Sequence, residues 1–234
     1  MCRVLGITQF EVHKHRELVT RFSGLVKTGV VMAEDPPGHA DGWGLAFYRE
    51  GQLVVHKSGR SLLDEFETVI GLLSELQTTP LMILHLRKSA WQNTSNTRHA
   101  HPFYCDQTVF FHNGVVYDYP ALLPEITIPG LAEDARDTEV FFYHVLSQQA
   151  PDLGQAFLAS AASIRRRFRF SALNSLFSDG ETFYAYREYA REPDYYSLFK
   201  AGRDDSLLIA SEPLDDRCDW VPMTQGEFLS VDFG

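Results

Sequence analysis

The residues that decide the fold are the first nine, Met1 to Gln9 (MCRVLGITQ), whose apolar part from Cys2 onward predicts a buried strand. Initiator methionine is commonly removed when the next residue is as small as cysteine. Cys2 would then carry a free α-amine beside its thiol. An α-amine titrates at about 7.7–8.0 and a free thiol at about 8.5, so near neutral pH the amine can accept the thiol proton and activate the sulfur. The alternative is that Cys2 is a small apolar strand residue.

The composition describes an acidic chain with enough apolar material for one large core. Of its 234 residues 44% are hydrophobic, and the formal net charge is -10. A surface this acidic repels phosphate backbones and anionic lipid, so we expect neither a nucleic acid nor a membrane as partner. No linker, repeat or low-complexity tract interrupts the sequence, which predicts a single domain over residues 1–234.

Three cysteines, an odd and sparse set, predict no disulfide framework. The N-terminus lacks a signal-peptide pattern, and no apolar run approaches about 18 residues. We therefore expect a cytoplasmic location. The one basic cluster, Arg165 to Arg167 with Arg169, is interpreted as the end of a helix, where cations favour the helix dipole.

The pattern of hydrophobic residues changes along the chain from strands to helices and back to strands. Helical spacing and turn signals predict helices over 15–27, 62–76, 137–149 and 152–167. Short apolar runs predict strands over 2–9, 44–49, 52–57, 81–87, 108–112, 170–177, 182–187, 195–200, 206–210 and 228–231. This order predicts an α+β fold in which two sheets have helices packed outside them.

An acyl-transfer site built on Cys2 needs donors for a developing oxyanion. Asn113 and Gly114 follow a predicted strand and offer a side-chain amide and a backbone N–H. One such donor is worth about 2.7–4 kcal/mol in the transition state. The alternative is a plain turn, because Asn-Gly is a common turn dipeptide with a preference for the left-handed region.

Two further residues could hold the charged ends of a substrate. Arg87 ends an apolar strand, and its guanidinium could grip a carboxylate through two parallel hydrogen bonds, although a structural ion pair is the alternative. Asp137 could bind an ammonium group. It could also serve as the N-cap of the following helix, and the two roles can coexist, with one oxygen capping and the other facing the ligand. A substrate with a carboxylate, an ammonium group and an acyl group is glutamine or another γ-glutamyl compound.

Six motifs follow one another along the chain: Cys2 behind Met1, 39–44 (HADGWG), 85–87 (HLR), 99–103 (HAHPF), 112–114 (HNG) and 137–139 (DTE). In this order they resemble the motifs of class II glutamine amidotransferases, which are N-terminal-nucleophile hydrolases. Late segments of the chain are similar to a subgroup of compact, stand-alone members of that family, so the resemblance runs from residue 2 to beyond 220. These late segments are 173–174 (LN) with 178–180 (SDG), and 210–214 (ASEPL) followed by Trp220.

The resemblance implies a four-layer αββα sandwich, the N-terminal-nucleophile hydrolase fold. It implies that Cys2 is the nucleophile and, through its α-amine, the general base. Asn113 and Gly114 would form the oxyanion hole, while Arg87 would hold the α-carboxylate and Asp137 the α-ammonium of the γ-glutamyl group. A γ-glutamyl thioester would form and be hydrolysed to glutamate, with release of ammonia or an amine. No metal and no other cofactor is expected.

The sequence leaves the identity of the γ-glutamyl substrate and the fate of the released ammonia open. Ammonia could pass to a separate synthase partner, or the protein could be a free-standing amidohydrolase. One departure from the family lies after Arg87, where residues 88–91 read KSAW and many relatives carry a threonine that helps to cover the glutamine pocket.

Two other functions remain as alternatives. The first is a non-catalytic γ-glutamyl-binding regulatory module on the same fold. The second is a histidine-ligated zinc hydrolase, because His99 and His101 would share one face of a strand and other histidines could complete the ligand set. Against zinc, His101 precedes a proline, and no pair of ligands stands at helical spacing.

Overall fold

The computed structural model describes residues 2–233. The expected removal of Met1 therefore lies outside the described residues. The helices are α1 (Val12–Thr28), α2 (Phe66–Leu76), α3 (Asp137–Leu146) and α4 (Leu153–Arg167), with 3₁₀ turns at Leu62–Asp64 and Tyr119–Glu125. The strands are β1 (Arg3–Glu11), β2 (Trp43–Arg49), β3 (Gln52–Ser58), β4 (Thr78–Leu86), β5 (Phe103–Cys105), β6 (Thr108–Asn113), β7 (Asn174–Ser178), β8 (Thr182–Tyr186), β9 (Phe199–Arg203), β10 (Ser206–Ala210), β11 (Val221–Pro222) and β12 (Phe228–Asp232).

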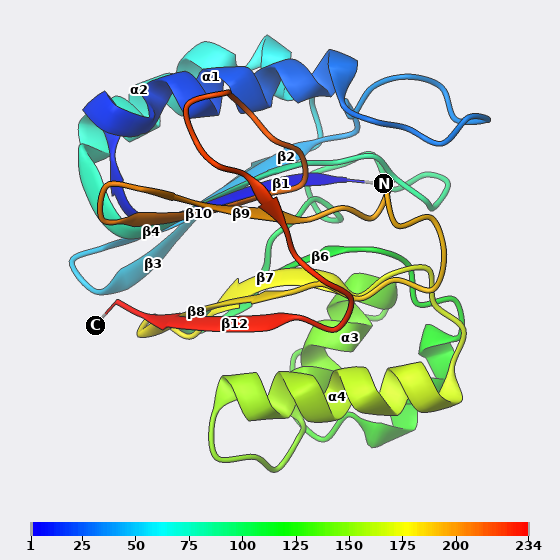
Figure 1. Ribbon diagram of the computed structural model, residues 1–234. Helices are drawn as coiled ribbons and strands as arrows, with labels where there is room; N and C mark the ends of the chain where they lie inside the picture. Colours follow the sequence, from blue (N-terminus) through cyan, green and yellow to red (C-terminus); the bar gives the residue numbers. More distant parts are fainter. Residues whose placement is uncertain (1, 234) are drawn as a thin grey trace.

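The elements form four layers (Figure 1). A seven-stranded sheet has the order β11-β9-β10-β1-β4-β2-β3, and a five-stranded sheet has the order β12-β8-β7-β6-β5. Helices α1 and α2 cover the outer face of the first sheet, and α3 and α4 cover the outer face of the second. The predicted αββα arrangement is therefore present, and β1 lies in the middle of its sheet between β10 and β4.

Successive side chains of the inner strands point to opposite faces of each sheet, and the buried apolar residues form three separate layers. In β1, Leu5 and Ile7 pack beneath α1 and α2, whereas Val4 faces the second sheet. Gly6 also lies between the sheets, where an added Cβ would come within 3.0 Å of the Phe183 ring. Because side chains alternate along a strand, residues of one parity at the ends of β1, β4 and β6 must point into the space between the sheets.

Most predicted elements are present, with shifted ends. The helix predicted over 62–76 begins as a 3₁₀ turn, and the strand predicted over 170–177 begins only at Asn174. The strand predicted over 195–200 is wrong in its first half, because Tyr195 and Tyr196 lie in a turn and β9 starts at Phe199. The expected strand face shared by His99 and His101 is also absent, since both residues lie in turns and bends before β5.

The basic cluster is where the sequence placed it. Arg165, Arg166 and Arg167 form the last turn of α4, and Arg167 pairs with Glu125 at 2.5 Å. Within residues 2–233, none of the helices combines the length and the apolar character required to cross a bilayer. The single domain over residues 1–234 stays a prediction.

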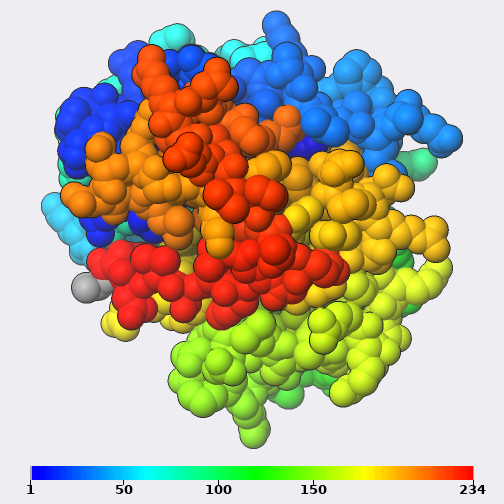
Figure 2. Space-filling view, in the orientation of Figure 1, coloured from blue at the N-terminus to red at the C-terminus, as the bar shows by residue number. Residues whose placement is uncertain are grey.

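The C-terminal segment ties the two sheets together. After β10 it contributes β11 to the seven-stranded sheet and β12 to the five-stranded sheet. Figure 2 shows this segment, in orange to red, crossing one face of the molecule between the two layers. The loop between α1 and β2, in blue, projects at the end of the molecule where β1 begins.

Candidate active site

Three strand ends bring the predicted residues to one end of the space between the sheets. Arg3 pairs with Leu86 in the β1–β4 ladder, so Cys2 and Arg87 are the next residues beyond that pair. Cys2 has the parity of Val4, and Arg87 has the parity of Ile83, and both Val4 and Ile83 face the second sheet. Cys2 and Arg87 therefore enter the same space from neighbouring strands.

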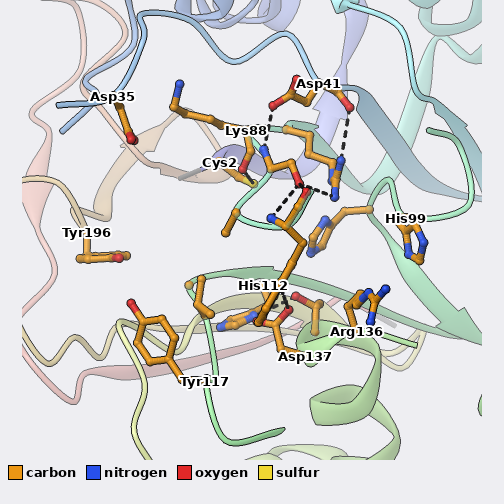
Figure 3. Close-up of a pocket in the computed structure, with 18 of the residues that line it drawn as sticks. Cys2, Asp35, Asp41, Lys88, His99, His112, Tyr117, Arg136, Asp137 and Tyr196 are labelled. Atoms are coloured by element: carbon orange, nitrogen blue, oxygen red, sulfur yellow. Dashed lines mark hydrogen bonds between the residues drawn. The ribbon is translucent and has the colours of Figure 1, made fainter. Parts of the chain in front are cut away.

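A cavity of about 530 Å³ opens at this place, within the range typical of ligand pockets. Cys2, Arg87, Gly114 and Asp137 all line it. In Figure 3 Cys2 and Lys88 lie above Asp137 and His112, with the cavity between them. Four of the five residues predicted for the site therefore share one cavity.

Cys2 is 8% exposed and directly precedes β1. Its Sγ lies 3.6 Å from the backbone carbonyl oxygen of Lys88. The fully buried Arg3 donates from Nη1 to the Cys2 carbonyl oxygen at 3.1 Å and pairs through Nε with Glu212 at 2.5 Å. The first residues of the chain are thus held by a buried ion pair as well as by the sheet.

Arg87 is buried, and its two terminal nitrogens donate mainly to the loop that follows it. Nη1 donates to the Thr94 carbonyl oxygen at 2.6 Å, and Nη2 donates to Thr94 Oγ1 at 2.8 Å and to Ser89 Oγ at 3.1 Å. Burial lowers the pKa of Arg87, while Cys2, Asp41 and Asp137 act in the opposite direction. A guanidinium remains charged in proteins, so a positive charge faces the cavity.

Asp137 is 3% exposed and begins α3. Its Oδ1 accepts from Trp91 Nε1 at 2.8 Å, and its Oδ2 accepts from the Val116 backbone N–H at 3.1 Å. Burial raises the pKa of Asp137, against the influence of His112 and of these donors. The N-cap interpretation is wrong, because Arg136 occupies the N-cap position and the Asp137 side chain points toward the cavity wall.

Asn113 and Gly114 do not form the turn that the dipeptide favours. Neither has a positive φ, and β6 ends at Asn113 opposite Asn174 of β7. Glycine is required at 114 for another reason, since an added Cβ would lie 1.9 Å from the Ala172 carbonyl oxygen. Within the described residues the buried Asn113 amide has no hydrogen-bond partner at either Nδ2 or Oδ1.

The Asn113 side chain borders a small void between the sheets, beside His85 and Leu198, rather than the main cavity. A buried amide without partners is costly, so an unpaired one calls for an explanation such as a ligand. Gly114, the next residue, lines the main cavity. The structure therefore places Asn113 next to the cavity but behind its wall.

Several buried histidines lie around the site. His85 and His101 stack with ring centroids 4.3 Å apart, and burial lowers the pKa of both well below the usual value. Burial, with Arg3 nearby, lowers the pKa of His39 to about 3. Between residues 2 and 233 no group of three or more His, Cys, Asp or Glu side chains is arranged to hold a metal ion. The zinc alternative thus finds no ligand set in this part of the chain.

The loop between β4 and β5 contributes residues that the sequence analysis missed. Trp91 bonds Asp137, and Thr94 bonds Arg87. Residues 88–91 lack the threonine that many relatives carry there, but Thr94 supplies a hydroxyl a few residues later. No local pattern signals these contacts, because the loop has no periodicity and Trp91 and Asp137 are 46 residues apart.

Comparison with known proteins gives the family and the fold. The family model described as class-II glutamine amidotransferases matches residues 1–198 of the chain. An uncharacterized protein of Methanocaldococcus jannaschii is 26% identical over 221 residues, which cover 82% of this chain and 61% of that protein. The chain thus spans less than two thirds of the length of this curated relative.

Two solved structures share the fold. One is a glutamine phosphoribosylpyrophosphate amidotransferase from B. subtilis, complexed with ADP and GMP (TM-score 0.70, 18% identity, 99% of this chain and 47% of that one). The other is a glutamine aminotransferase class-II domain protein from Silicibacter pomeroyi (TM-score 0.62, 17% identity, 100% of both chains). At these identities the likeness shows the fold alone, and it confirms the predicted N-terminal-nucleophile hydrolase sandwich.

Proposed function

The chain belongs to the class II glutamine amidotransferase family, and from this premise we propose that it is an amidohydrolase that cleaves γ-glutamyl amides with Cys2 as nucleophile. One observation carries the proposal. Two buried side chains of opposite charge, Arg87 from the end of β4 and Asp137 from the start of α3, line the cavity that also holds Cys2. An α-amino acid group carries the two complementary charges.

In the proposed mechanism Met1 is removed and the α-amine of Cys2 takes the proton of its own thiol. The thiolate attacks the γ-carbonyl carbon, and the backbone N–H of Gly114 with the amide of Asn113 stabilises the oxyanion. The C–N bond then breaks, and the α-ammonium gives its proton to the departing nitrogen. Water, deprotonated by the freed amine, attacks the γ-glutamyl thioester and releases glutamate and the Cys2 thiol.

The surroundings of Asn113 support its part in this mechanism. Its neighbour across the ladder, Asn174, uses both ends of its amide, donating to the Tyr196 carbonyl oxygen at 3.0 Å and accepting from the Glu188 backbone N–H at 2.9 Å. Among residues 2–233 Asn113 has no such partner, and its amide lies behind the cavity wall. Its role in the mechanism requires this free amide to turn toward Cys2, where it can donate to a developing negative charge.

The released ammonia or amine either passes to a separate synthase partner or is released into solution. The chain covers 47% of the B. subtilis amidotransferase, so the likeness does not extend to the activity of that whole enzyme.

The test combines intact mass with glutamate release. We expect the purified protein to lack Met1 and to release glutamate from a γ-glutamyl amide, and we expect Cys2→Ala to reduce the rate by at least about 10³-fold with an unchanged circular dichroism spectrum. Cys105→Ala is the matched control and should retain the rate, since Cys105 lies outside the cavity.

Three results would reject the proposal in different ways. Substantial turnover by Cys2→Ala would remove the nucleophile from the mechanism. An active protein that retains Met1 would remove the α-amine base. Binding of γ-glutamyl amides without turnover of any of them, by protein that has lost Met1, would favour the non-catalytic γ-glutamyl-binding module.

A further inference from the structure

The cavity extends past Cys2, away from the groups proposed to hold the glutamyl end. In Figure 3 His99 and Arg136 lie on one side of Cys2, while Asp35, Tyr117 and Tyr196 lie on the other. If glutamine were the substrate, its leaving group would be a single ammonia molecule, which needs little room. The second side is nevertheless lined by large side chains from three different loops.

We call this second side the amine subsite and define it as Met32, Asp35, Tyr117, Tyr195 and Tyr196. Met32 and Asp35 belong to the loop between α1 and β2, Tyr117 follows β6, and the tyrosine pair precedes β9. Tyr117 is 49% exposed at the rim, whereas Tyr195 and Tyr196 are buried in the wall. Tyr117 is therefore the tyrosine of this group that a ligand ring can reach at the rim.

The buried tyrosines of the amine subsite are held in place by hydrogen bonds to the Tyr196 carbonyl and by ring packing. The Tyr196 carbonyl oxygen accepts from Asn174 Nδ2 at 3.0 Å and from Arg187 Nε at 3.2 Å. The Tyr195 ring packs edge-on against Tyr196 with centroids 5.1 Å apart, and it lies 5.5 Å from the Arg3 guanidinium carbon. A wall fixed in this way loses little conformational entropy when a ligand ring packs against it.

The carboxylate of the amine subsite is that of Asp35. Tyr195 donates from its hydroxyl to Asp35 Oδ2 at 3.4 Å, and burial raises the pKa of Tyr196 to about 12, so the phenol stays neutral. Two cations, Lys88 and Arg3, lie beside the amine subsite, and both already have partners. Lys88 donates from Nζ to the carbonyl oxygens of Pro36 and Gly38, and Arg3 pairs with Glu212.

We propose that the amine subsite takes a leaving amine that carries an aromatic ring and no carboxylate, so that the substrate is a γ-glutamyl arylalkylamide rather than glutamine or a γ-glutamyl peptide. This proposal rests on the function proposed above. Tyrosine rings favour an aromatic leaving group through offset or edge-on packing. Asp35 disfavours a leaving group with its own carboxylate, because like charges repel.

The test compares glutamate release from γ-glutamyltyramine, γ-glutamyltyrosine and glutamine. The first two substrates differ only by a carboxylate on the leaving amine. We expect kcat/KM for γ-glutamyltyramine to exceed that for each of the other two by about tenfold or more. Equal or faster turnover of glutamine would overturn the amine subsite and leave the proposed function standing. Release from none of the three would overturn both.

Two variants test the residues themselves. Asp35→Asn should bring kcat/KM for γ-glutamyltyrosine closer to that for γ-glutamyltyramine, because the repulsion is removed. Tyr117→Ala should lower the ratio of γ-glutamyltyramine to glutamine turnover by about five- to tenfold. Tyr104→Ala is the matched control, since Tyr104 is 52% exposed but lies outside the cavity. An unchanged ratio in Tyr117→Ala, or an equal drop in Tyr104→Ala, would contradict the proposal.

Discussion

The indole Nε1 of Trp91 donates a 2.8 Å hydrogen bond to Asp137 Oδ1 and so joins the loop after β4 to the first turn of α3. Trp91 lies in the loop that runs from β4 of the seven-stranded sheet to β5 of the five-stranded sheet, whose outer face α3 covers. The same loop engages Arg87 through Thr94. Both charged groups proposed to hold the substrate are therefore oriented by a single loop.

Trp91→Phe keeps an aromatic ring but removes the indole donor. Burial already raises the pKa of Asp137, and the bond from Trp91 opposes that rise, so its loss raises the pKa further. Asp137 must be ionised to bind an ammonium group, so the acidic limb of the kcat/KM profile should move to higher pH. At neutral pH substrate binding should weaken by about two- to tenfold. Trp220→Phe is the control, because Trp220 Nε1 has no hydrogen-bond partner and lies outside the cavity. A limb that stays in place in Trp91→Phe would argue against the role of Asp137.

Asn113→Ala should lower kcat by about 10²–10³-fold with little change in stability, because the amide has no partner to lose. Asn174→Ala, in contrast, should lower the free energy of unfolding. It leaves the Tyr196 carbonyl oxygen and the Glu188 N–H without their bonds, at a cost of about 1–3 kcal/mol each. Single-turnover kinetics and urea unfolding of both variants check this contrast. A large loss of stability in Asn113→Ala, with kcat retained, would show a structural amide.

Arg87→Lys keeps the positive charge but loses the planar fork that bonds Thr94 and would bond a carboxylate. We expect KM to rise by about 10–100-fold and kcat to fall much less. Arg98→Lys is the control, since Arg98 pairs with Asp134 and Glu139 and lies outside the cavity. An unchanged KM in Arg87→Lys would refute the carboxylate clamp.

The stability of the fold should fall as the pH falls below about 6.5, the usual pKa of histidine. His39 is fully buried, and its pKa is lowered to about 3, so between these two values the unfolded chain binds a proton that the folded chain does not. The contribution of His39 is therefore neutral above about pH 6.5 and increasingly destabilising as the pH falls toward 3.

His39→Gln removes this difference. The change in unfolding free energy between pH 7.5 and 5.5 should become smaller by about 1.4 kcal/mol, whatever the absolute stability of the variant. Urea unfolding at the two pH values measures it. His13→Gln is the control, because the His13 side chain is 70% exposed. The same pH dependence in His39→Gln as in the parent would mean that His39 is protonated in the folded state.

Much of this protein could be predicted from local sequence patterns. The apolar runs of β1 and β6 indicate strands buried on both faces, and the helical spacing in α1 indicates which face of that helix is buried, because burial is what a short window of sequence records. The candidates at 2, 87, 113, 114 and 137 followed from residue chemistry at the predicted ends of elements. The αββα order of layers followed from the order of strands and helices, and from the resemblance to the family.

The sequence by itself determined which residues carry reactive or charged groups and on which side of a strand they stand. Only the tertiary structure decided that Cys2 and Arg87 meet across the β1–β4 ladder, that Asp137 faces Trp91 rather than capping its helix, and that Tyr195 and Tyr196 form a turn beside the cavity. The physical reason is the distance along the chain. These contacts join residues tens to hundreds of positions apart, and their free energy depends on which layers pack together, a property that no local window contains.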